Sequence, residues 1–416
     1  MFALVDCNNF FVSCEKVFNP KLKGPILVLS SNDGCVVARS AEAKKIGIPM
    51  GAPAFLHRDL FMRHKVKVFS SNFSLYSDMS RRVMETLETF TPDLQIYSVD
   101  EAFLFFPALK SKNELSYIRE RVLQWTGLPV SIGFSKTKTL SKVANHYAKK
   151  SKEGVVILGS DAEIEGALID LPVEDIWGVG HKTASWLHSQ SIYTAKELRD
   201  VDDNWIRKHL SVVMLRLVWE LRGMSNLPLE EVAAPRQSTV CSRTFGERIT
   251  ELEPLLEAVA TFTASAAETI REEGSIASHI SVFIVGHERV KERFPYFESG
   301  ITLREATSYT PTLITAAKEL TQKLYRPNTP YRKAGVLLSG LIAKEALQLD
   351  LFSTTSSSQR KKQERVMTLM DQMNQEYGKQ VLRPASTGSQ KERWRRKADS
   401  CSPRYTTSWN EILEVH

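Results

Sequence analysis

The sequence contains little that would form disulfide bonds or a zinc site. Its five cysteines are widely separated, and neither a C-x-x-C pair nor histidines at zinc spacing accompany them. This arrangement excludes a disulfide framework and indicates no zinc site. Long apolar runs are also missing, since none approaches the roughly 18 residues that a membrane-spanning helix needs. The first ten residues have no signal-peptide pattern. We therefore expect a cytoplasmic protein that makes no contact with a membrane.

The bulk composition is typical of a folded, multidomain protein. Hydrophobic residues make up 42% and charged residues 25% of the 416 residues, which is the balance of a globular chain. This length exceeds what one hydrophobic core organises, so we expect about three domains. The net charge of +7 suits a polyanionic partner such as nucleic acid, but it suits a basic enzyme equally well. Net charge alone therefore does not distinguish a nucleic-acid-binding protein from a basic enzyme.

Strand-like and helix-like segments alternate from the start of the chain, which predicts an α+β fold. The apolar patterns predict strands over 2–6, 26–29 and 130–133, a hairpin over 95–105, and helices over 75–87, 114–124 and 140–150. Ser111 and Glu114 form a capping-box pattern at the start of the helix over 114–124.

The second half of the chain divides by composition. A helical segment runs over 171–229, and strand-like runs alternate with helix-like runs over 237–343. After Leu347 the composition becomes polar and basic. We expect a partly disordered arm over 353–400 that carries one helical patch near 366–373.

Three acidic residues form the first candidate site. Asp6 ends a predicted buried strand, and Asp100 and Glu101 lie between the two arms of the predicted hairpin. Carboxylates that converge repel one another unless cations neutralise them, and their hard oxygen atoms suit Mg²⁺. Two such ions about 3.5 to 4 Å apart catalyse in-line phosphoryl transfer. Spacing alone equally allows a strand-end aspartate and a solvated Asp-Glu turn.

Two longer motifs resemble those of the Y-family DNA polymerases. The first is DCNNFFVSCE at 6–15, and the second is YSVDEAF at 97–103. Further similar runs lie at 30–47, 70–76, 133–150, 171–180 and 241–249. The resemblance follows the UmuC branch of the family as far as SPRYTT at 402–407. It therefore covers nearly the whole chain.

The resemblance implies a right-hand polymerase that performs error-prone translesion synthesis in the SOS response to DNA damage. Its substrates would be primer–template DNA and deoxynucleoside triphosphates. The implied domains are a palm at 1–25 and 73–170, small fingers at 26–72, a helical thumb with a helix-hairpin-helix at 171–235, a little finger at 236–346, and a clamp-binding and partner-binding tail at 347–416. Asp6, Asp100 and Glu101 would bind two Mg²⁺ ions and carry the catalysis.

A nucleotide-binding set follows from the same resemblance. Its members are Cys7, Phe10, Phe11, Arg39, Lys44 and Lys149. Phe11 would be the steric gate, an aromatic ring that leaves no room for a ribose 2′-hydroxyl, where UmuC relatives commonly have tyrosine. A buried Phe10–Phe11 pair is the structural alternative. Arg39, Lys44 and Lys149 would neutralise the triphosphate.

Composition alone predicts a different role for the lysines near the helix over 140–150. These lysines are Lys136, Lys138, Lys142, Lys149 and Lys150. On their number and spacing we expect a solvated helix face. The role of Lys149 at the triphosphate thus rests on the resemblance.

A glycine-rich turn is the candidate DNA contact. In the run WGVGHK at 177–182, Gly178 and Gly180 would let the backbone approach a phosphate, with Lys182 beside them. It resembles the hairpin of polymerase thumbs, although a G-x-G is as often just a tight turn. The next helix has its own capping-box pattern, Thr194 with Glu197.

The segment QLDLF resembles a sliding-clamp-binding pentapeptide. Its residues are Gln348, Leu349, Asp350, Leu351 and Phe352, and an extended peptide of this kind docks its apolar side chains in a pocket of the clamp. The end of a strand is the alternative. The resemblance also implies a UmuD-type accessory dimer and RecA as partners.

Two other functions remain open at this point. A non-catalytic DNA-binding repair scaffold would not need all three carboxylates. A two-metal nuclease would need a positioned histidine or another water-activating base, and no such residue is evident.

Overall fold

The computed structural model describes residues 1–229, 235–287, 294–347, 356–378, 381–388, 394 and 397–412. The chain forms two compact units, of which the first comprises Met1–Ala233 together with Asp399–His416 and the second comprises Ala234–Ala398. The chain therefore leaves the first unit, builds the second, and returns to the first at its C-terminal end.

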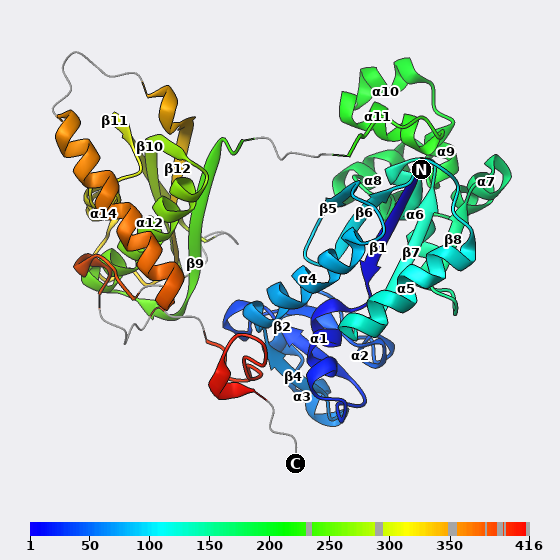
Figure 1. Cartoon of the computed structure of the whole chain (residues 1–416), viewed down its shortest axis with the longest axis horizontal. Coiled ribbons are helices and arrows are strands. Elements are labelled where there is room, and N and C mark those ends of the chain that lie inside the picture. Colours follow the sequence, from blue (N-terminus) through cyan, green and yellow to red (C-terminus); the bar gives the residue numbers. More distant parts are fainter. Residues whose placement is uncertain are drawn as a thin grey trace. The chain divides into compact units, whose positions relative to one another are not determined.

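A five-stranded mixed sheet forms the centre of the first unit, with the strand order β5-β6-β1-β7-β8 (Figure 1). Its strands are β1 (Phe2–Cys7), β5 (Leu94–Ile96), β6 (Glu101–Phe105), β7 (Val130–Ser135) and β8 (Val155–Leu158). Antiparallel β6 and β7 flank β1, and β8 runs parallel to β7. β1 is buried along its whole length because it lies at the middle of the sheet.

Helices cover both faces of this sheet. They are α4 (Phe73–Glu88), α5 (Lys112–Thr126) and α6 (Lys138–Ala148). The apolar side chains of α4 and α5 share one core with Val5 and Ile132. Gly133, the next residue of β7, faces the backbone of α6 on the opposite side, as the alternation of a strand requires. The capping box predicted at Ser111 and Glu114 is present and starts α5.

A small insert and a short helix join β1 to α4. The helix is α1 (Phe10–Phe18). The insert is a three-stranded sheet in the order β3-β2-β4 with two short helices, and its elements are β2 (Ile26–Leu29), β3 (Val36–Arg39), α2 (Ala41–Lys45), α3 (Arg58–Arg63) and β4 (Lys67–Ser70). It has its own small apolar core.

The last part of the first unit is helical. Its elements are α7 (Asp161–Ile169), α8 (His181–Ser189), α9 (Ala195–Arg199), α10 (Asp203–His209) and α11 (Val212–Leu221). They form one core together with the apolar side chains of α6. The capping box predicted at Thr194 and Glu197 is present at the start of α9.

The second unit is an antiparallel sheet in the order β11-β10-β12-β9, with two packed helices. Its elements are β9 (Ser238–Ile249), α12 (Leu252–Glu272), β10 (Ser275–Gly286), β11 (Tyr296–Thr307), α13 (Thr310–Leu324) and β12 (Tyr331–Ala343), followed by α14 (Ser357–Tyr377). The predicted α+β multidomain fold is confirmed.

The prediction of a partly disordered arm over 353–400 was wrong for much of that range. Helix α14 is held to the rest of its unit by a bidentate ion pair in which Arg271 donates to both oxygens of Asp371, at 2.7 and 2.8 Å. Trp394 is buried against Phe262, with 5.5 Å between ring centroids. The polar composition of this range does not predict these contacts, because the buried partners belong to another helix, α12.

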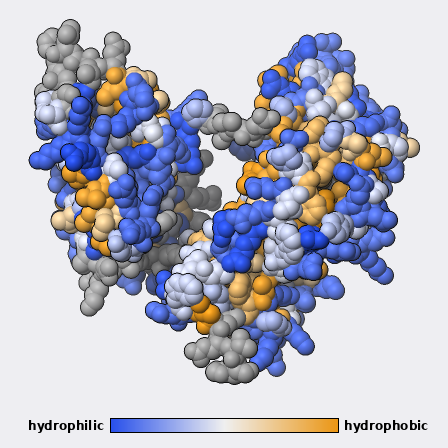
Figure 2. Space-filling model, in the orientation of Figure 1, coloured by the Kyte–Doolittle hydropathy of each residue, from blue (hydrophilic) through white to orange (hydrophobic). Residues whose placement is uncertain are grey.

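The surface is mostly hydrophilic. On the face drawn in Figure 2, hydrophobic residues appear as small separate patches. In the part of the chain that the structure describes, no helix is both long enough and apolar enough to cross a membrane.

Gly133 lets α6 approach β7. A Cβ atom there would lie 2.1 Å from the amide nitrogen of Asn145 and 2.3 Å from the carbonyl oxygen of Ser141, so Gly133→Ala would push helix and sheet apart. We expect the free energy of unfolding to fall toward the upper end of about 1 to 3 kcal/mol. Urea unfolding measures it.

The matched control is Gly166→Ala in α7, where a Cβ atom would meet nothing within 4 Å. This change should stabilise the protein by about 0.5 to 1 kcal/mol, because alanine favours a helix over glycine. Equal stability of the two variants would contradict the close packing of α6 on β7.

Candidate active site

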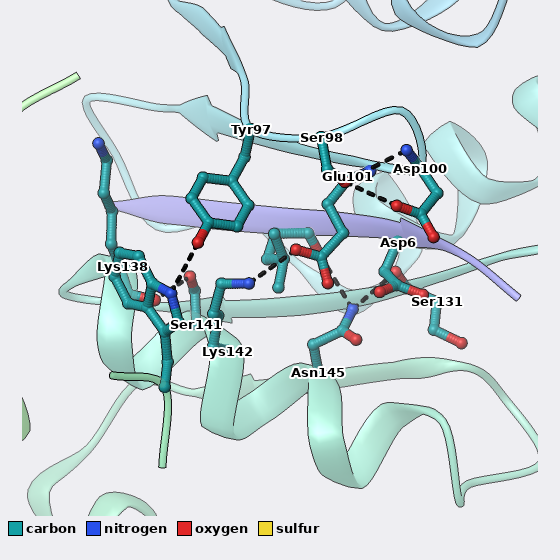
Figure 3. Close-up of polar contacts among 12 residues, drawn as sticks. Asp6, Tyr97, Ser98, Asp100, Glu101, Ser131, Lys138, Ser141, Lys142 and Asn145 are labelled. Atoms are coloured by element: carbon teal, nitrogen blue, oxygen red, sulfur yellow. Dashed lines mark hydrogen bonds and ion pairs between the residues drawn. The ribbon is translucent and has the colours of Figure 1, made fainter. Parts of the chain in front are cut away.

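The sheet brings two of the three predicted carboxylates together. Asp6 on β1 lies opposite Glu101 on β6 in the antiparallel register, so their side chains leave the same face of the sheet. Asp6 is buried. A hydrogen bond joins the two carboxyl groups. This pair lies on the face that α6 covers (Figure 3).

The pKa of Asp6 is raised toward neutral pH. Burial raises the pKa of Asp6 to about 7, the hydrogen bond with Glu101 acts in the same direction, and the ion pair with Lys149 opposes both. Burial also acts to raise the pKa of Glu101, but the hydrogen bond from Asp6 and the ion pair with Lys142 outweigh it and hold that pKa below its usual value. Carboxyl oxygens that share a proton can take a divalent cation in its place.

Asp100 lies in the turn before β6. The hydroxyl of Ser98 donates to Oδ1 of Asp100 at 2.6 Å and accepts the amides of Asp100 and Glu101. The carbonyl oxygen of Asp100 accepts the amide of Cys7 at 2.8 Å, which ties the turn to the end of β1. Burial raises the pKa of the Cys7 thiol, and the charges of Asp6, Asp100 and Glu101 add to this effect.

The expected convergence of three carboxylates is present for only two of them. In the described ranges, no three Asp, Glu, His or Cys side chains lie close enough together to hold a metal ion. Asp100 is turned to the hydroxyl of Ser98, while Asp6 and Glu101 pair with lysines. Carboxylates take such separate partners because their charges repel.

Helix α6 supplies the positive charges that face the pair. Lys142 and Asn145, with Lys149 just after the helix, follow one another at helical spacing and share one face. Lys149 Nζ lies 2.6 Å from Asp6 Oδ2, and Lys142 Nζ lies 2.7 Å from Glu101 Oε2. Asn145 donates to the carbonyl oxygens of Leu4 and Ser131, which fixes the helix against β1 and β7 (Figure 3).

The prediction of a solvated lysine face was wrong for Lys138 and Lys142, whereas the side chain of Lys149 is 45% exposed although it also contacts a carboxylate. Lys142 and Lys149 pair with the carboxylates, and Lys138 is buried with its Nζ atom 2.6 Å from the carbonyl oxygen of Pro228. Sequence reasoning missed Lys142 as a site residue. The signal was its position seven residues before Lys149, which places both on one side of a helix.

A cluster of cations lies beside Asp6. Burial lowers the pKa of Lys44, the charges of Arg39 and Lys149 lower it further, and the charge of Asp6 opposes them. Arg39 donates from Nη1 to the carbonyl oxygen of Ile48, and its buried Nε has no hydrogen-bond partner among the residues that the structure describes. The structure thus brings together the three cations that were predicted for the triphosphate.

The aromatic residues follow directly after β1. Asn9 adopts a left-handed backbone conformation with φ of 49° and starts α1, a conformation that asparagine tolerates better than most residues. Phe10 is buried in the core, as the structural alternative predicted, but Phe11 is only partly buried. Its ring stacks on Tyr76 with 4.4 Å between centroids. No role was predicted for Tyr76.

The glycine-rich turn lies between a 3₁₀-helix (Val173–Asp175) and α8. Gly178 has φ of +89°, which favours glycine, and Gly180 is the N-cap of α8. Lys182 is exposed. Trp177 donates to the hydroxyl of Tyr97 at 2.9 Å, which ties this turn to the motif that carries Asp100 and Glu101. The predicted clamp segment, 348–352, lies outside the described residues.

Three family matches cover most of the chain. Residues 5–146 match the impB/mucB/samB family, residues 236–351 match the impB/mucB/samB family C-terminal domain, and residues 364–415 match a domain of unknown function (DUF4113).

Solved structures with this fold are Y-family DNA polymerases. A chimera titled Dbh-Dpo4(243-245)-Dbh aligns with a TM-score of 0.63 at 20% identity, and an insertion ternary complex of Dbh DNA polymerase aligns with 0.52 at 21%. Each alignment covers 82% of this chain and 99% of the other. The fold of this chain is therefore that of the Y-family DNA polymerases, and its relatives of higher sequence identity place it in that class.

The chain belongs to the impB/mucB/samB family within that class. It is 42% identical to the protein UmuC of Salmonella typhimurium strain LT2 over the full length of both chains. It is 37% identical to ImpB of Salmonella typhimurium, with 99% of each chain covered. DNA polymerase IV 1 of Bacillus subtilis strain 168 is 27% identical, with 92% of each covered. The resemblance to the UmuC branch is confirmed.

Removal of the Lys149 charge should move the proton on the carboxylate pair. Lys149 lowers the pKa of Asp6 by charge and by hydrogen bonding, so Lys149→Met should raise that pKa above about 7, by at least about one pH unit. Carboxyl NMR titration in the presence of a chelator measures it. Lys150→Met is the control, since Lys150 contacts His146 instead. Identical Asp6 titrations in both variants would rule out the Lys149 contact.

Proposed function

We propose that this polymerase carries out error-prone synthesis across damaged DNA by two-metal nucleotidyl transfer at Asp6, Asp100 and Glu101. One observation carries the proposal, namely that Asp6 and Glu101 lie side by side on neighbouring central strands of the sheet and each pairs with a lysine, with the charges of Lys44 and Arg39 nearby. A non-catalytic scaffold would have no use for a buried carboxyl pair that costs folding free energy.

The metal ions would be two Mg²⁺, and the oxygen atoms of the three carboxylates would hold them. Y-family polymerases use divalent metals, and the hard oxygen ligands here suit Mg²⁺. The hydrogen bond between Asp6 and Glu101 marks the place where a cation would bind. Ser98 would release the carboxylate of Asp100, whose turn stays tied to β1. When bound, the ions activate the primer 3′-hydroxyl and stabilise the leaving pyrophosphate.

The chain's own cations bind and orient the triphosphate of the incoming nucleotide. Lys149, Lys44 and Arg39 lie near enough to act on one another electrostatically, and a triphosphate would relieve their mutual repulsion. The buried Nε of Arg39 gains an acceptor in the same way. Cys7 and Phe10 pack beneath the nucleotide, and the ring of Phe11 blocks a ribose 2′-hydroxyl.

The fingers insert at 26–72 is too small to enclose the nascent base pair tightly. Its helices α2 and α3 have five and six residues. An open site of this kind tolerates distorted template bases, and it gives up fidelity in return.

Other segments of the chain bind DNA and partner proteins. The turn with Gly178, Gly180 and Lys182 binds the DNA backbone through the amides at the start of α8. The segment 348–352 binds a sliding clamp, and a UmuD-type dimer and RecA complete the active complex. The polymerase then works on chromosomal DNA in the cytoplasm.

Primer extension tests this function. The purified chain, with and without clamp and RecA filament, is assayed on intact and abasic templates with Mg²⁺. We expect incorporation opposite the abasic site and a high error rate on the intact template. Cleavage of the DNA without incorporation would favour a nuclease, and binding without either reaction would favour a scaffold.

Loss of Asp100 should stop the chemistry. Metal-ion catalysis contributes several kcal/mol of transition-state stabilisation, so Asp100→Ala should slow incorporation at least ~100-fold. DNA binding and thermal unfolding should stay close to those of the unaltered chain. Asp93→Ala, an exposed aspartate on the same hairpin, is the control and should extend primers normally. Normal extension by Asp100→Ala would remove Asp100 from the metal site.

Loss of the Phe11 ring should admit ribonucleotides. Phe11→Ala opens space where the 2′-hydroxyl would lie, so the preference for deoxynucleotides should fall at least ~10-fold while deoxynucleotide use changes little. Single-nucleotide kinetics with matched ribo- and deoxyribonucleotides measure the ratio. An unchanged ratio would make Phe11 an ordinary packing residue.

Loss of Leu351 and Phe352 should uncouple the enzyme from the clamp. Fully buried apolar side chains contribute about 1.5 to 3 kcal/mol each, so the double change to alanine should weaken clamp binding at least ~100-fold. Clamp-independent extension should hardly change, because the carboxylates lie in the other unit. Thr354→Ala with Thr355→Ala is the control pair. Equal clamp binding by all variants would contradict the motif.

A further inference from the structure

The C-terminal strap, residues 399–412, returns to the first unit and extends its small insert. Cys401 forms a parallel bridge with Ser70 at the end of β4. The amide of Ser70 donates to the carbonyl oxygen of Ser400, and the amide of Ser400 donates to Oγ of Ser70, both at 3.0 Å. The strap is thus attached where β4 leads into α4.

Asn72 connects the strap to the start of α4. Its Oδ1 accepts the amide of Leu75 and caps the helix. Its Nδ2 donates to the carbonyl oxygen and hydroxyl of Ser402 and to the carbonyl oxygen of Pro403, at 3.0 to 3.1 Å. Asn72 is buried. One amide side chain therefore orients both α4 and the strap.

A second buried carboxyl group, Glu15 on α1, joins the strap to the aromatic residues. Its Oε1 accepts the hydroxyl of Tyr76 at 2.7 Å and the hydroxyl of Ser402 at 3.1 Å. Glu15 is 1% exposed. Burial raises the pKa of Glu15, and the two hydroxyl donors oppose that effect. A carboxyl group this deeply buried needs its donors.

Ring stacking connects Tyr76 to Phe11. The two rings stack with 4.4 Å between centroids and 15° between planes. The strap also reaches the far end of α1, where Tyr405 stacks on Phe18 with 4.9 Å between centroids. The strap therefore holds α1 and α4, the two helices that carry the stacked pair.

We propose that the C-terminal strap sets ribonucleotide exclusion, because Ser402 holds Glu15, Glu15 holds the hydroxyl of Tyr76, and the Tyr76 ring positions Phe11. The proposal rests on the proposed role of Phe11 as the gate. Ser402, Glu15 and Tyr76 are positioning residues, since only Phe11 would touch the sugar.

The physical reason is the small tolerance of a steric gate. A ring excludes a single hydroxyl group only while it is held within a fraction of an ångström of its place. Without the Ser402 hydroxyl, Glu15 keeps only the hydroxyl of Tyr76 as a donor. The carboxylate is then held less firmly, and so is the Tyr76 ring that is bonded to it. Phe11 then gains freedom to move aside for a 2′-hydroxyl, while the deoxynucleotide still fits.

The test compares sugar selectivity in the full chain. For Ser402→Ala and Tyr76→Phe, we expect the ratio of kcat/KM for deoxynucleotide over ribonucleotide to fall about 3- to 10-fold, the range that one lost hydrogen bond gives. The change should lie in kcat/KM for the ribonucleotide, with deoxynucleotide kcat within about twofold. The double variant should lose little more than either single variant, since both act through Glu15.

Two controls accompany these variants. Ser402→Thr keeps the hydroxyl and should keep the normal ratio. Thr407→Ala changes an exposed side chain of the strap and should leave both selectivity and thermal unfolding unchanged.

The outcomes separate this inference from the function on which it rests. If Phe11→Ala loses selectivity while Ser402→Ala and Tyr76→Phe keep it, the proposed role of the strap is contradicted and the proposed role of Phe11 stands. Normal selectivity in Phe11→Ala would contradict both the role of Phe11 as the gate and the role of the strap. If Ser402→Ala fails to fold, Tyr76→Phe decides, because it keeps the ring and its packing and removes only the hydroxyl.

Discussion

The placement of two carboxyl groups on the buried central strands of a sheet is the constraint on which the first unit depends. Asp6 and Glu101 lie side by side with little access to water, so each needs a charge partner. Helix α6 supplies these partners from one face, and Gly133 lets it come close enough to do so. In the proposed function, cations would replace these lysines at the carboxylates, and Lys149 would bind the triphosphate instead. The ion pairs that stabilise the fold therefore also keep the carboxylates charged and in position at the proposed site.

The buried carboxyl groups at the sheet and at α1 are stabilised in two different ways. At the sheet, lysines pair with Asp6 and Glu101, and a hydrogen bond joins the two carboxyl groups. At α1, two hydroxyl groups donate to Glu15. In the proposed function, metal ions would replace the first arrangement, because its partners are cations themselves. The second is suited to holding geometry, because neutral hydroxyl donors give direction without competing for phosphate.

The C-terminal part of the chain shows why composition misleads about order. The region that matches a domain of unknown function, 364–415, contributes α14 and Trp394 to the second unit and the strap to the first. Its residues are mostly polar, so they form no core of their own. Arg271, Phe262, Asn72 and Glu15 supply their partners. Polar side chains become ordered when the groups they satisfy are already buried.

Local chemistry determined much of this protein from its sequence alone. The strand of Asp6 and the capping boxes at Ser111 and Thr194 follow from neighbouring residues, because apolar periodicity and caps act within a few positions. The polymerase family was identified instead by the resemblance of the motifs at 6–15 and 97–103. The approach of Lys142 to Glu101, the stacking of Phe11 on Tyr76, and the contact of Ser402 with Glu15 across 387 residues of sequence were decided only by the tertiary structure. Each depends on which side of a buried helix meets which strand, and no local pattern records that.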